Sequence, residues 1–422
     1  MQLCIFEDIY HDRLEPLIYS RPTYDLVCGI NSLRKKILRA YPDVKYSLHC
    51  RPYLEHFVQN KNPGCDVNIV NDEECLFVNG RILAPPNMAK IIPLTGEDKL
   101  YVNNETIIAA RVSGKKFKEI QSNLNDLLSE SNFDGLPKEQ VNIKSIDYIW
   151  NITHYNGDEL RSDYEQLKIS KKINNKNNIL GKIYDGVNLV EKDNIFIDEE
   201  AVVKPGAVID GSAGPVYIDK KAKIFSNSVI EGAVYIGEGT QIKSCARIYE
   251  NVSIGQVCKV GGEVEDTIFL PYSNKQHSGF LGHAYLGSWV NIGADTNCSD
   301  LKNNYGHVKV YVNGGIVDSG SQFLGVIMGD HTKTAINTMF NTGTIVGVSC
   351  NIFGAGFPPK YIPSFSWGGS DAVTTYDIDK SIETGKRVMA RRKKEMSDAE
   401  EKLFRKIFDL TKKERRKRGY PY

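Results

Sequence analysis

The sequence lacks a long apolar run, a paired cysteine motif and an excess of charge of either sign. No stretch approaches the ~20 apolar residues of a membrane-spanning helix, and acidic residues within the first ten positions do not fit a secretory signal. Lys and Arg number 53 against 52 Asp and Glu, which argues against a protein that coats nucleic acid. The 9 cysteines include no C-x-x-C pair, so we expect reduced thiols. These absences predict a cytoplasmic protein with neither a membrane nor a nucleic acid as partner.

An aliphatic residue recurs at every sixth position through the middle of the chain, and a small or β-branched residue follows each one after four positions. The uninterrupted series is Ile218, Ile224, Ile230, Ile236, Ile242, Ile248, Ile254 and Val260. A period of six fits neither an amphipathic helix nor a simple alternating strand. It is typical of a chain that turns a corner every six residues, so that three faces make a coil and each coil covers the one below. The pattern predicts a left-handed parallel β-helix.

The six-residue series extends in both directions, with interruptions. Its further members are Ile197, Val203, Ile209, Phe280, Leu286, Ile292, Met328, Thr334, Phe340, Val346 and Ile352. At ~18 residues to a coil, about nine coils fit between residues 195 and 356. The polar segment 297–307 breaks the series, and we expect it to leave the prism as a loop. Loops on a rigid scaffold commonly carry the chemistry of a protein.

Short strands alternate with helices before the repeat begins, which indicates an α/β domain. The expected strands are residues 3–6, 46–50, 67–70 and 76–78, and the expected helices include 34–41 and 117–129. Two helices are expected in the tail, and Ser397 with Glu400 forms a capping box for the second one. The predicted organisation is 1–165 as the α/β domain, 166–194 as a Lys- and Asn-rich linker, 195–357 as the β-helix domain and 358–422 as a C-terminal extension with helices.

Half of the histidines lie in the second half of the repeat region. They are His277, His283, His307 and His331. Acyl transfer from a thioester to an amine needs a base, and a neutral histidine is suited to that role near pH 7. Lys275, two residues before His277, is positioned in sequence to hold a substrate phosphate. The other three histidines are interpreted as ordinary loop residues, and no zinc centre is predicted because none of them form a close pair at ligand spacing.

Two segments around His277 carry a family resemblance. Gln276–Gly282 and Val290–Thr296 resemble the acetyltransferase domain of the bifunctional N-acetylglucosamine-1-phosphate uridyltransferase/glucosamine-1-phosphate acetyltransferase family. The resemblance implies that His277 is the catalytic base and that Asn291 contacts the sugar. Phe280 stands where the family has a tyrosine that helps to bind the sugar phosphate. Lys275 and Phe280 are thus expected in the substrate site, while Ser319, in a run similar to a family turn, is expected near the acetyl-CoA thioester.

The amino-terminal part resembles a divergent sugar nucleotidyltransferase. The similar segments are Leu17–Pro22 and Leu76–Arg81. Residues 1–40 contain no glycine-rich phosphate loop of the usual kind, and Asn79 stands where a carboxylate would hold Mg²⁺. Arg21 is the residue expected to meet a nucleotide phosphate, with UTP as the nucleotide and Mg²⁺ as a cofactor if this domain is active.

The resemblance implies an enzyme that transfers an acetyl group from acetyl-CoA to a glucosamine-1-phosphate-like amino sugar, and a homotrimer of β-helices. Coupled nucleotidyl transfer would then form a UDP-sugar. Two alternatives stay open. The chain is either a non-catalytic nucleotide-sugar-binding scaffold or sensor, or a nucleotidyltransferase alone in which the β-helix serves assembly. The basic residues of the tail alternate with acidic ones, so they are interpreted as solvated helices or as groups near the CoA phosphates.

Overall fold

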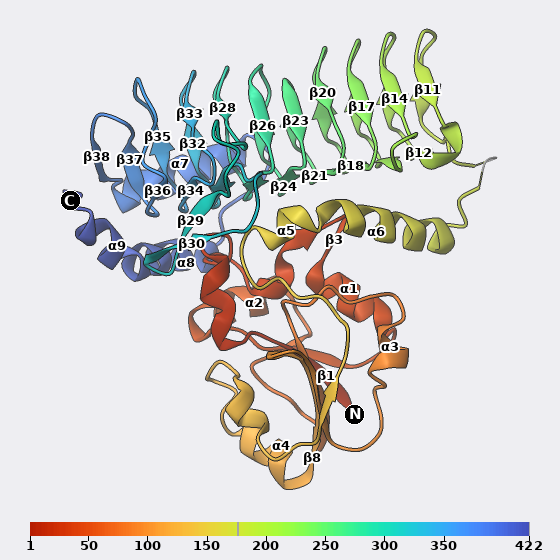
Figure 1. Ribbon diagram of the computed structural model, residues 1–422, viewed down its shortest axis with the longest axis vertical. Helices are drawn as coiled ribbons and strands as arrows, with labels where there is room; N and C mark the ends of the chain where they lie inside the picture. The colour runs from red at the N-terminus through yellow and green to blue at the C-terminus, as the bar shows by residue number, and fades with distance from the viewer. Residues whose placement is uncertain (175–176, 422) are drawn as a thin grey trace. The chain divides into compact units, whose positions relative to one another are not determined.

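The computed structural model describes residues 1–174 and 177–421 of the chain (Figure 1). They form two compact units, each assembled from segments that are distant in sequence. The first unit comprises Met1–Leu26, Asn31–Ile149 and Ser397–Lys406, and the second comprises Val27–Ile30, Trp150–Met396 and Ile407–Tyr422. Within the described residues, every helix is too short or too polar to cross a membrane.

A seven-stranded mixed sheet organises the first unit, in the order β5-β4-β1-β6-β8-β7-β9. Its first four strands run parallel, whereas β8 pairs antiparallel with both β6 and β7. The strands are β1 (Gln2–Phe6), β4 (Tyr46–Leu48), β5 (Asp66–Val67), β6 (Glu74–Asn79), β7 (Lys99–Asn103), β8 (Thr106–Ser113) and β9 (Lys138–Gln140). The helices of this unit include α1 (Leu33–Ala40), α2 (Glu55–Lys61), α3 (Met88–Ile91) and α4 (Gly114–Gln121). The predicted α/β fold of this part is confirmed.

Several elements of this unit differ from what the sequence led us to expect. The helix expected at 117–129 begins at Gly114 and already ends at Gln121. Strands β7 and β8 were not predicted. In β8 all six residues between the end residues are buried, and such a continuous buried run cannot be distinguished from a buried helix by its period.

Stacked, mostly parallel strands form the three faces of a prism, which makes up most of the second unit (Figure 1). The nine-stranded face contains β12 (Ile195–Ile197), β15 (Val216–Ile218), β18 (Val234–Ile236), β21 (Val252–Ile254), β24 (Ile268–Phe269), β27 (Tyr285–Leu286), β31 (Ile327–Met328), β34 (Ile345–Val346) and β36 (Tyr361–Ile362). The eight-stranded face contains β11 (Asn188–Val190), β14 (Val208–Asp210), β17 (Val229–Glu231), β20 (Arg247–Ile248), β23 (Glu263–Glu265), β26 (Phe280–Gly282), β28 (Asn297–Cys298) and β33 (Met339–Phe340).

The third face consists of two sheets joined by single bridges at Asn291. Its strands are β10 (Lys182–Ile183), β13 (Val202–Val203), β16 (Lys223–Ile224), β19 (Gln241–Ile242), β22 (Lys259–Val260), β25 (Asn274–Lys275), β32 (Lys333–Thr334), β35 (Asn351–Ile352), β37 (Ser366–Gly368) and β38 (Val373–Thr375). The predicted left-handed parallel β-helix is therefore confirmed.

The aliphatic series fills the inside of the prism as the period required. Ile236 lies directly between its partners Ile218 and Ile254 in the neighbouring coils, and all three are fully buried. A continuous core cluster runs from Ile195 to Ile362. Each coil therefore buries its aliphatic residues only against the coils above and below, which is how repeat proteins build a core.

One predicted core position is wrong. Phe280 was expected to continue the aliphatic series, but Leu281 takes the core position and pairs with Val264. The cause is a shortened coil. Fewer residues separate the paired residues Ile248 and Val264 than separate the paired residues Ile230 and Ile248 in the coil before. The period of six therefore loses its phase at this point, and Phe280 is left only half-buried.

The prism is longer than the segment assigned to it from the sequence. Strands β10 and β11 lie within residues 166–194, which were expected to be a linker, and β36 and β37 lie within residues 358–422. Helix α6 (Asn156–Ser170) precedes the first coil and belongs to the second unit. The tail contains α7 (Ile378–Ala390), α8 (Asp398–Leu410) and a short third helix, α9 (Lys412–Lys417). The expected capping box is present, since the Glu400 carboxylate accepts from the Ser397 amide and the Glu400 amide donates to Ser397 Oγ.

Candidate functional site

Strand β26 has a histidine-bearing turn at each of its ends. His277 lies in the turn that precedes the strand, and His283 follows it at the next corner of the prism. The two turns differ in burial and in the residues that surround them.

The His277 turn is held by a buried lysine. Lys275 lies on β25 opposite Val260, a position that aliphatic residues occupy in most coils, and is 1% exposed. Its Nζ donates to the carbonyl oxygens of Gly261 at 3.2 Å, His277 at 3.1 Å and Gly279 at 2.5 Å. Burial lowers the pKa of Lys275 to about 8. All three donors of the ammonium are thus used by main-chain carbonyls, so Lys275 fixes the turn, and its expected contact with a substrate phosphate stays a prediction.

The side chain of His277 is exposed on this clamped turn. Phe280 begins β26 directly after this turn, and its amide donates to Asn297 Oδ1 at 2.8 Å. Asn291 is exposed on the next coil, where its backbone bridges to Asn274 beside the lysine. The structure therefore brings the expected base and the expected substrate-binding residues onto two adjacent coils, and their roles stay predictions.

The expected loop at 297–307 is longer than the polar segment suggested. After β28 the chain leaves the prism and returns only at β31, and between them β29 (Lys309–Val312) and β30 (Gly315–Asp318) form an antiparallel hairpin. Ser319 follows this hairpin and is half-buried. Its Oγ accepts from the Ser321 amide at 3.1 Å. Ser319 therefore lies on the segment between β28 and β31 that leaves the prism, called the excursion below, and not on the coils that carry His277. Its contact with acetyl-CoA stays a prediction.

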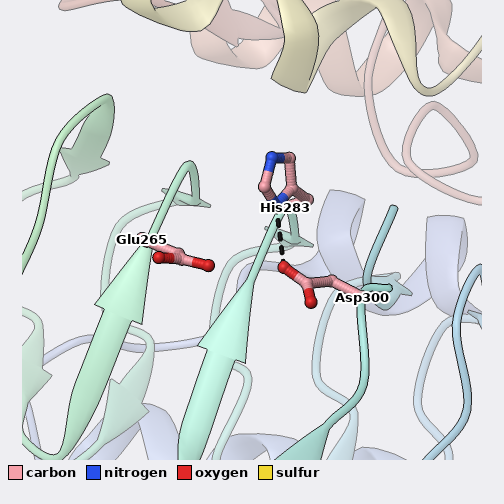
Figure 2. A group of neighbouring side chains, drawn as sticks. All are labelled: Glu265, His283 and Asp300. Atoms are coloured by element: carbon pink, nitrogen blue, oxygen red, sulfur yellow. Dashed lines mark hydrogen bonds and ion pairs between the residues drawn. The ribbon is translucent and has the colours of Figure 1, made fainter. Parts of the chain in front are cut away.

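The His283 corner contains carboxylates that the sequence interpretation missed (Figure 2). His283 Nδ1 is 2.8 Å from Asp300 Oδ2, and Nε2 is 3.7 Å from Asp266 Oδ2. Ligand atoms of Glu265, His283 and Asp300 all lie within 4.8 Å of one another. The sequence does contain a signal, because Asp266, His283 and Asp300 recur at intervals of 17 residues, close to one coil. The interpretation of His283 as an ordinary loop histidine does not describe this environment.

The pKa values of this corner reflect burial and crowded negative charge. Burial, followed by the charge of Asp300, raises the pKa of the Glu265 carboxyl. Burial likewise raises the pKa of Asp266, although His283 opposes this. For His283 burial acts to lower the pKa, but the hydrogen bond to Asp300 and the charge of Asp266 outweigh burial and leave the pKa raised. The carboxylates thus repel one another, and their charge favours the protonated form of the imidazole.

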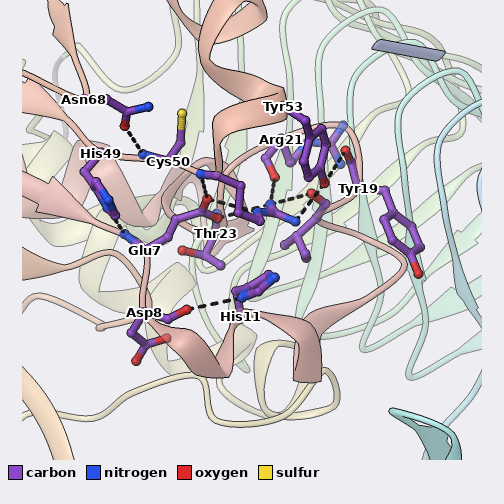
Figure 3. Close-up of polar contacts among 12 residues, drawn as sticks. Glu7, Asp8, His11, Tyr19, Arg21, Thr23, His49, Cys50, Tyr53 and Asn68 are labelled. Carbon is purple, nitrogen blue, oxygen red and sulfur yellow. Dashed lines mark hydrogen bonds and ion pairs between the residues drawn. The ribbon is translucent and has the colours of Figure 1, made fainter. Parts of the chain in front are cut away.

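In the first unit, Arg21 lies beside a buried ion pair (Figure 3). Arg51 Nε donates to Glu7 Oε2 at 3.1 Å, and the same carboxylate accepts from the Thr23 amide at 2.8 Å. Arg51 also donates to the Arg21 carbonyl at 2.9 Å, while Arg21 donates from its own guanidinium to the Leu17 carbonyl at 3.0 Å. This network fixes the turn that carries Arg21, whose contact with a nucleotide phosphate stays a prediction.

The end of β6 does not fit a magnesium ion. Asn79 Nδ2 donates to Asp8 Oδ2 at 3.0 Å, and Arg81 donates to both oxygens of the same carboxylate, at 2.9 and 2.5 Å. Arg81 is 1% exposed and also pairs with Asp147 at 3.0 Å. A guanidinium already neutralises the carboxylate nearest to Asn79, so a divalent cation there would meet a buried positive charge.

Residues 3–172 match the family described as sugar nucleotidyl transferase. The chain is 29% identical over 182 residues to the bifunctional protein GlmU of Methanococcus aeolicus, covering 38% of this chain and 40% of that protein. It is 32% identical over 202 residues to a bifunctional sugar-1-phosphate nucleotidylyltransferase/acetyltransferase of Sulfurisphaera tokodaii, covering 41% and 50%. The chain thus spans half the length of these curated relatives or less.

Among solved structures, the chain is similar to a UDP-N-acetylglucosamine acyltransferase from Campylobacter jejuni. The TM-score is 0.26 with 13% sequence identity, and the match covers 54% of this chain and 96% of that one.

Proposed function

We propose that this chain transfers an acetyl group from acetyl-CoA to the amine of a glucosamine-1-phosphate-like sugar, because it is similar to bifunctional GlmU proteins and its residues 3–172 match a sugar nucleotidyl transferase family. The observation that carries the proposal is the His277 turn. An exposed imidazole lies on a turn that Lys275 clamps through three carbonyls. A base held on a rigid backbone loses little entropy when a substrate is positioned against it.

In the proposed reaction, neutral His277 removes a proton from the substrate amine as the nitrogen bonds to the thioester carbonyl carbon. Backbone amides stabilise the negative oxygen of the tetrahedral intermediate. The carbon–sulfur bond then breaks, and the imidazolium returns the proton to the sulfur, so that CoA leaves as the thiol. Asn291 orients the sugar and Phe280 packs beside it, while Ser319 contacts the acetyl-CoA.

The test is acetyl-CoA-dependent thiol release, measured over a panel of amino-sugar phosphates. His277→Ala should lower the rate by about 10²- to 10⁴-fold, the usual range for loss of a general base. His56→Ala is the matched control, because this exposed histidine lies on α2 in the other unit. Release at a near wild-type rate from His277→Ala would remove this residue from the mechanism. A protein that binds a nucleotide sugar but releases no thiol would favour the scaffold alternative.

We further propose that three chains associate as a homotrimer and that the acetyl-CoA site lies between neighbouring prisms. Closed cyclic symmetry is the usual form of homo-oligomers, and a prism presents three flat faces for packing. The molar mass from light scattering at micromolar concentration checks this. A monomeric mass would contradict both the assembly and the shared site.

The second candidate activity is nucleotidyl transfer, because residues 3–172 match a sugar nucleotidyl transferase family. We expect only slow turnover, because the Asp8 carboxylate already accepts hydrogen bonds from Asn79 and Arg81 and is therefore not free to bind Mg²⁺. The measurement is UTP-dependent pyrophosphate release from N-acetylglucosamine-1-phosphate with excess Mg²⁺, repeated with Arg21→Ala and Asn79→Asp. Fast wild-type turnover that collapses in Arg21→Ala would show that this unit binds phosphate by another route.

A further inference from the structure

We infer that Glu265, His283 and Asp300 bind a divalent transition-metal ion, with Zn²⁺ as the preferred occupant. The inference does not depend on acetyl transfer, because His277 lies at the other end of β26. Metal binding and thiol release are therefore tested separately.

The repeat itself brings the three ligands together. Glu265 ends β23, His283 follows β26 and Asp300 follows β28, and these strands are successive neighbours in the eight-stranded face. Neighbouring strands are ~4.8 Å apart. His283 and Asp300 occupy equivalent positions of successive coils, and Glu265, which pairs with Gly282, lies one residue earlier on the preceding coil, so the three side chains can converge on one ion. The ligand atoms lie within 4.8 Å of one another. Figure 2 shows the three side chains. One imidazole and two carboxylates leave coordination positions for water.

The charges around the site also favour a cation. Three carboxylates, those of Glu265, Asp266 and Asp300, surround a single imidazole. In the part of the chain that the structure describes, no lysine or arginine forms an ion pair with any of the three. Asp300 is only 7% exposed, so solvent screens its charge weakly. A divalent ion would offset this excess of negative charge.

The residues around the ligands are arranged as in a built metal site. Asp266 lies 3.7 Å from Nε2 of His283 and accepts a hydrogen bond from Asn251 Nδ2 at 2.9 Å. The negative charge of Asp266 on this side of the ring favours a proton on Nε2, which leaves Nδ1 for the metal. Gly282 leaves the space that Asp300 needs, because a Cβ at this position would lie 2.3 Å from Asp300 Oδ2. On binding, the ion replaces the proton between Nδ1 and Asp300, and that proton passes to solvent.

The test uses the full chain, stripped of metal with a chelator and kept reduced, and titrated with Zn²⁺ by calorimetry. We expect one saturable site per chain. His283→Gln and Asp300→Asn should each weaken it by more than ~100-fold, beyond what changes to outer-shell groups usually cause. His307→Gln is the matched control, because His307 also pairs with an aspartate, Asp318 at 3.4 Å, but at an exposed position. It should bind Zn²⁺ as the wild type does.

Several outcomes would overturn the inference. They are the absence of a saturable site, equal binding by wild type and both variants, and tighter binding of Mg²⁺ than of Zn²⁺. Melting temperatures without metal identify variants that misfold. We expect Asp300→Asn to change the metal-free value little, because weaker repulsion between the carboxylates offsets the loss of the charged bond to His283. If His283→Gln fails to fold, Asp300→Asn and Glu265→Gln decide. Added Zn²⁺ should raise the melting temperature of the wild type and of His307→Gln only.

Discussion

The coils between residues 195 and 260 and those between 264 and 352 share one core but use their corners differently. In the earlier coils, the corner residues with a left-handed backbone conformation include Asn227 and Cys245, and the side chain of Cys245 is exposed. In the later coils the corner residues stack on one another. Tyr272 and Trp289 are parallel at 4.2 Å, and His283 lies between two aspartates. The interior therefore sets the fold, while the corners are free to acquire chemistry.

The comparison implies that a substitution in the regular coils acts on folding alone. Ile242→Asp should prevent soluble folding, because it buries an unpaired carboxylate at a cost of several kcal/mol, on the order of the stability of a domain. Gln241→Asp is the matched control, since Gln241 is half-exposed and pairs between Lys223 and Lys259. Soluble yield and circular dichroism measure both. An Ile242→Asp protein that melts like the wild type would mean that the core register is misassigned.

The clamped turn should couple stability to pH. Lys275→Met leaves three carbonyls without their donor and should cost about 1–3 kcal/mol at pH 7. The pKa of Lys275 is about 8 in the folded protein, below the ordinary 10.5, so the unfolded chain binds more protons between these values. The stability of the wild type should therefore rise from pH 8 to 10.5, while that of the variant should not.

Urea unfolding of both proteins at pH 7 and pH 9.5 measures this difference. The contributions of all other titrating groups to the free energy of unfolding are the same in both proteins and cancel in the comparison. Two identical pH profiles would show that the ammonium at this position is not destabilised by burial.

A smaller effect on stability is expected at the His283 corner. Gly282→Ala should destabilise the protein by about 1–3 kcal/mol, since its Cβ would lie 2.3 Å from Asp300 Oδ2 and must push that carboxylate aside. Gly315→Ala is the control, because the nearest atom to an added Cβ there is 3.8 Å away. Thermal melts of both variants check the prediction. An unchanged melting temperature for Gly282→Ala would show that the corner is looser than described.

The smallest effect is expected on the excursion. Ser319→Ala removes one hydroxyl, which accepts from the Ser321 amide, and one hydrogen bond contributes about 0.5–1.5 kcal/mol. We therefore expect the KM for acetyl-CoA to rise by about 2- to 10-fold with kcat unchanged. A change in kcat alone would place Ser319 in the chemical step and not in the binding of acetyl-CoA.

The sequence predicts the prism well because its core is repetitive in one dimension. Each aliphatic residue, such as Ile236, touches equivalents at a fixed separation, so the period alone specifies the contact. The prediction fails at Phe280, where a shortened coil shifts the phase. It also missed the partners of His283, because a period of core residues carries no information about corner side chains. Which corner side chains lie next to one another can be predicted only when the length of each coil is known.

The carboxyl end of the prism closes in a way that bears on self-association. Strand β38 turns back and pairs antiparallel with β37, whereas the neighbouring strands of that face run parallel. A stack of parallel coils otherwise ends in a row of free amides and carbonyls, onto which a second molecule could add its own coil. Removing β38 would leave such a template at the last coil, and a protein built of stacked coils would then be prone to head-to-tail growth into fibres.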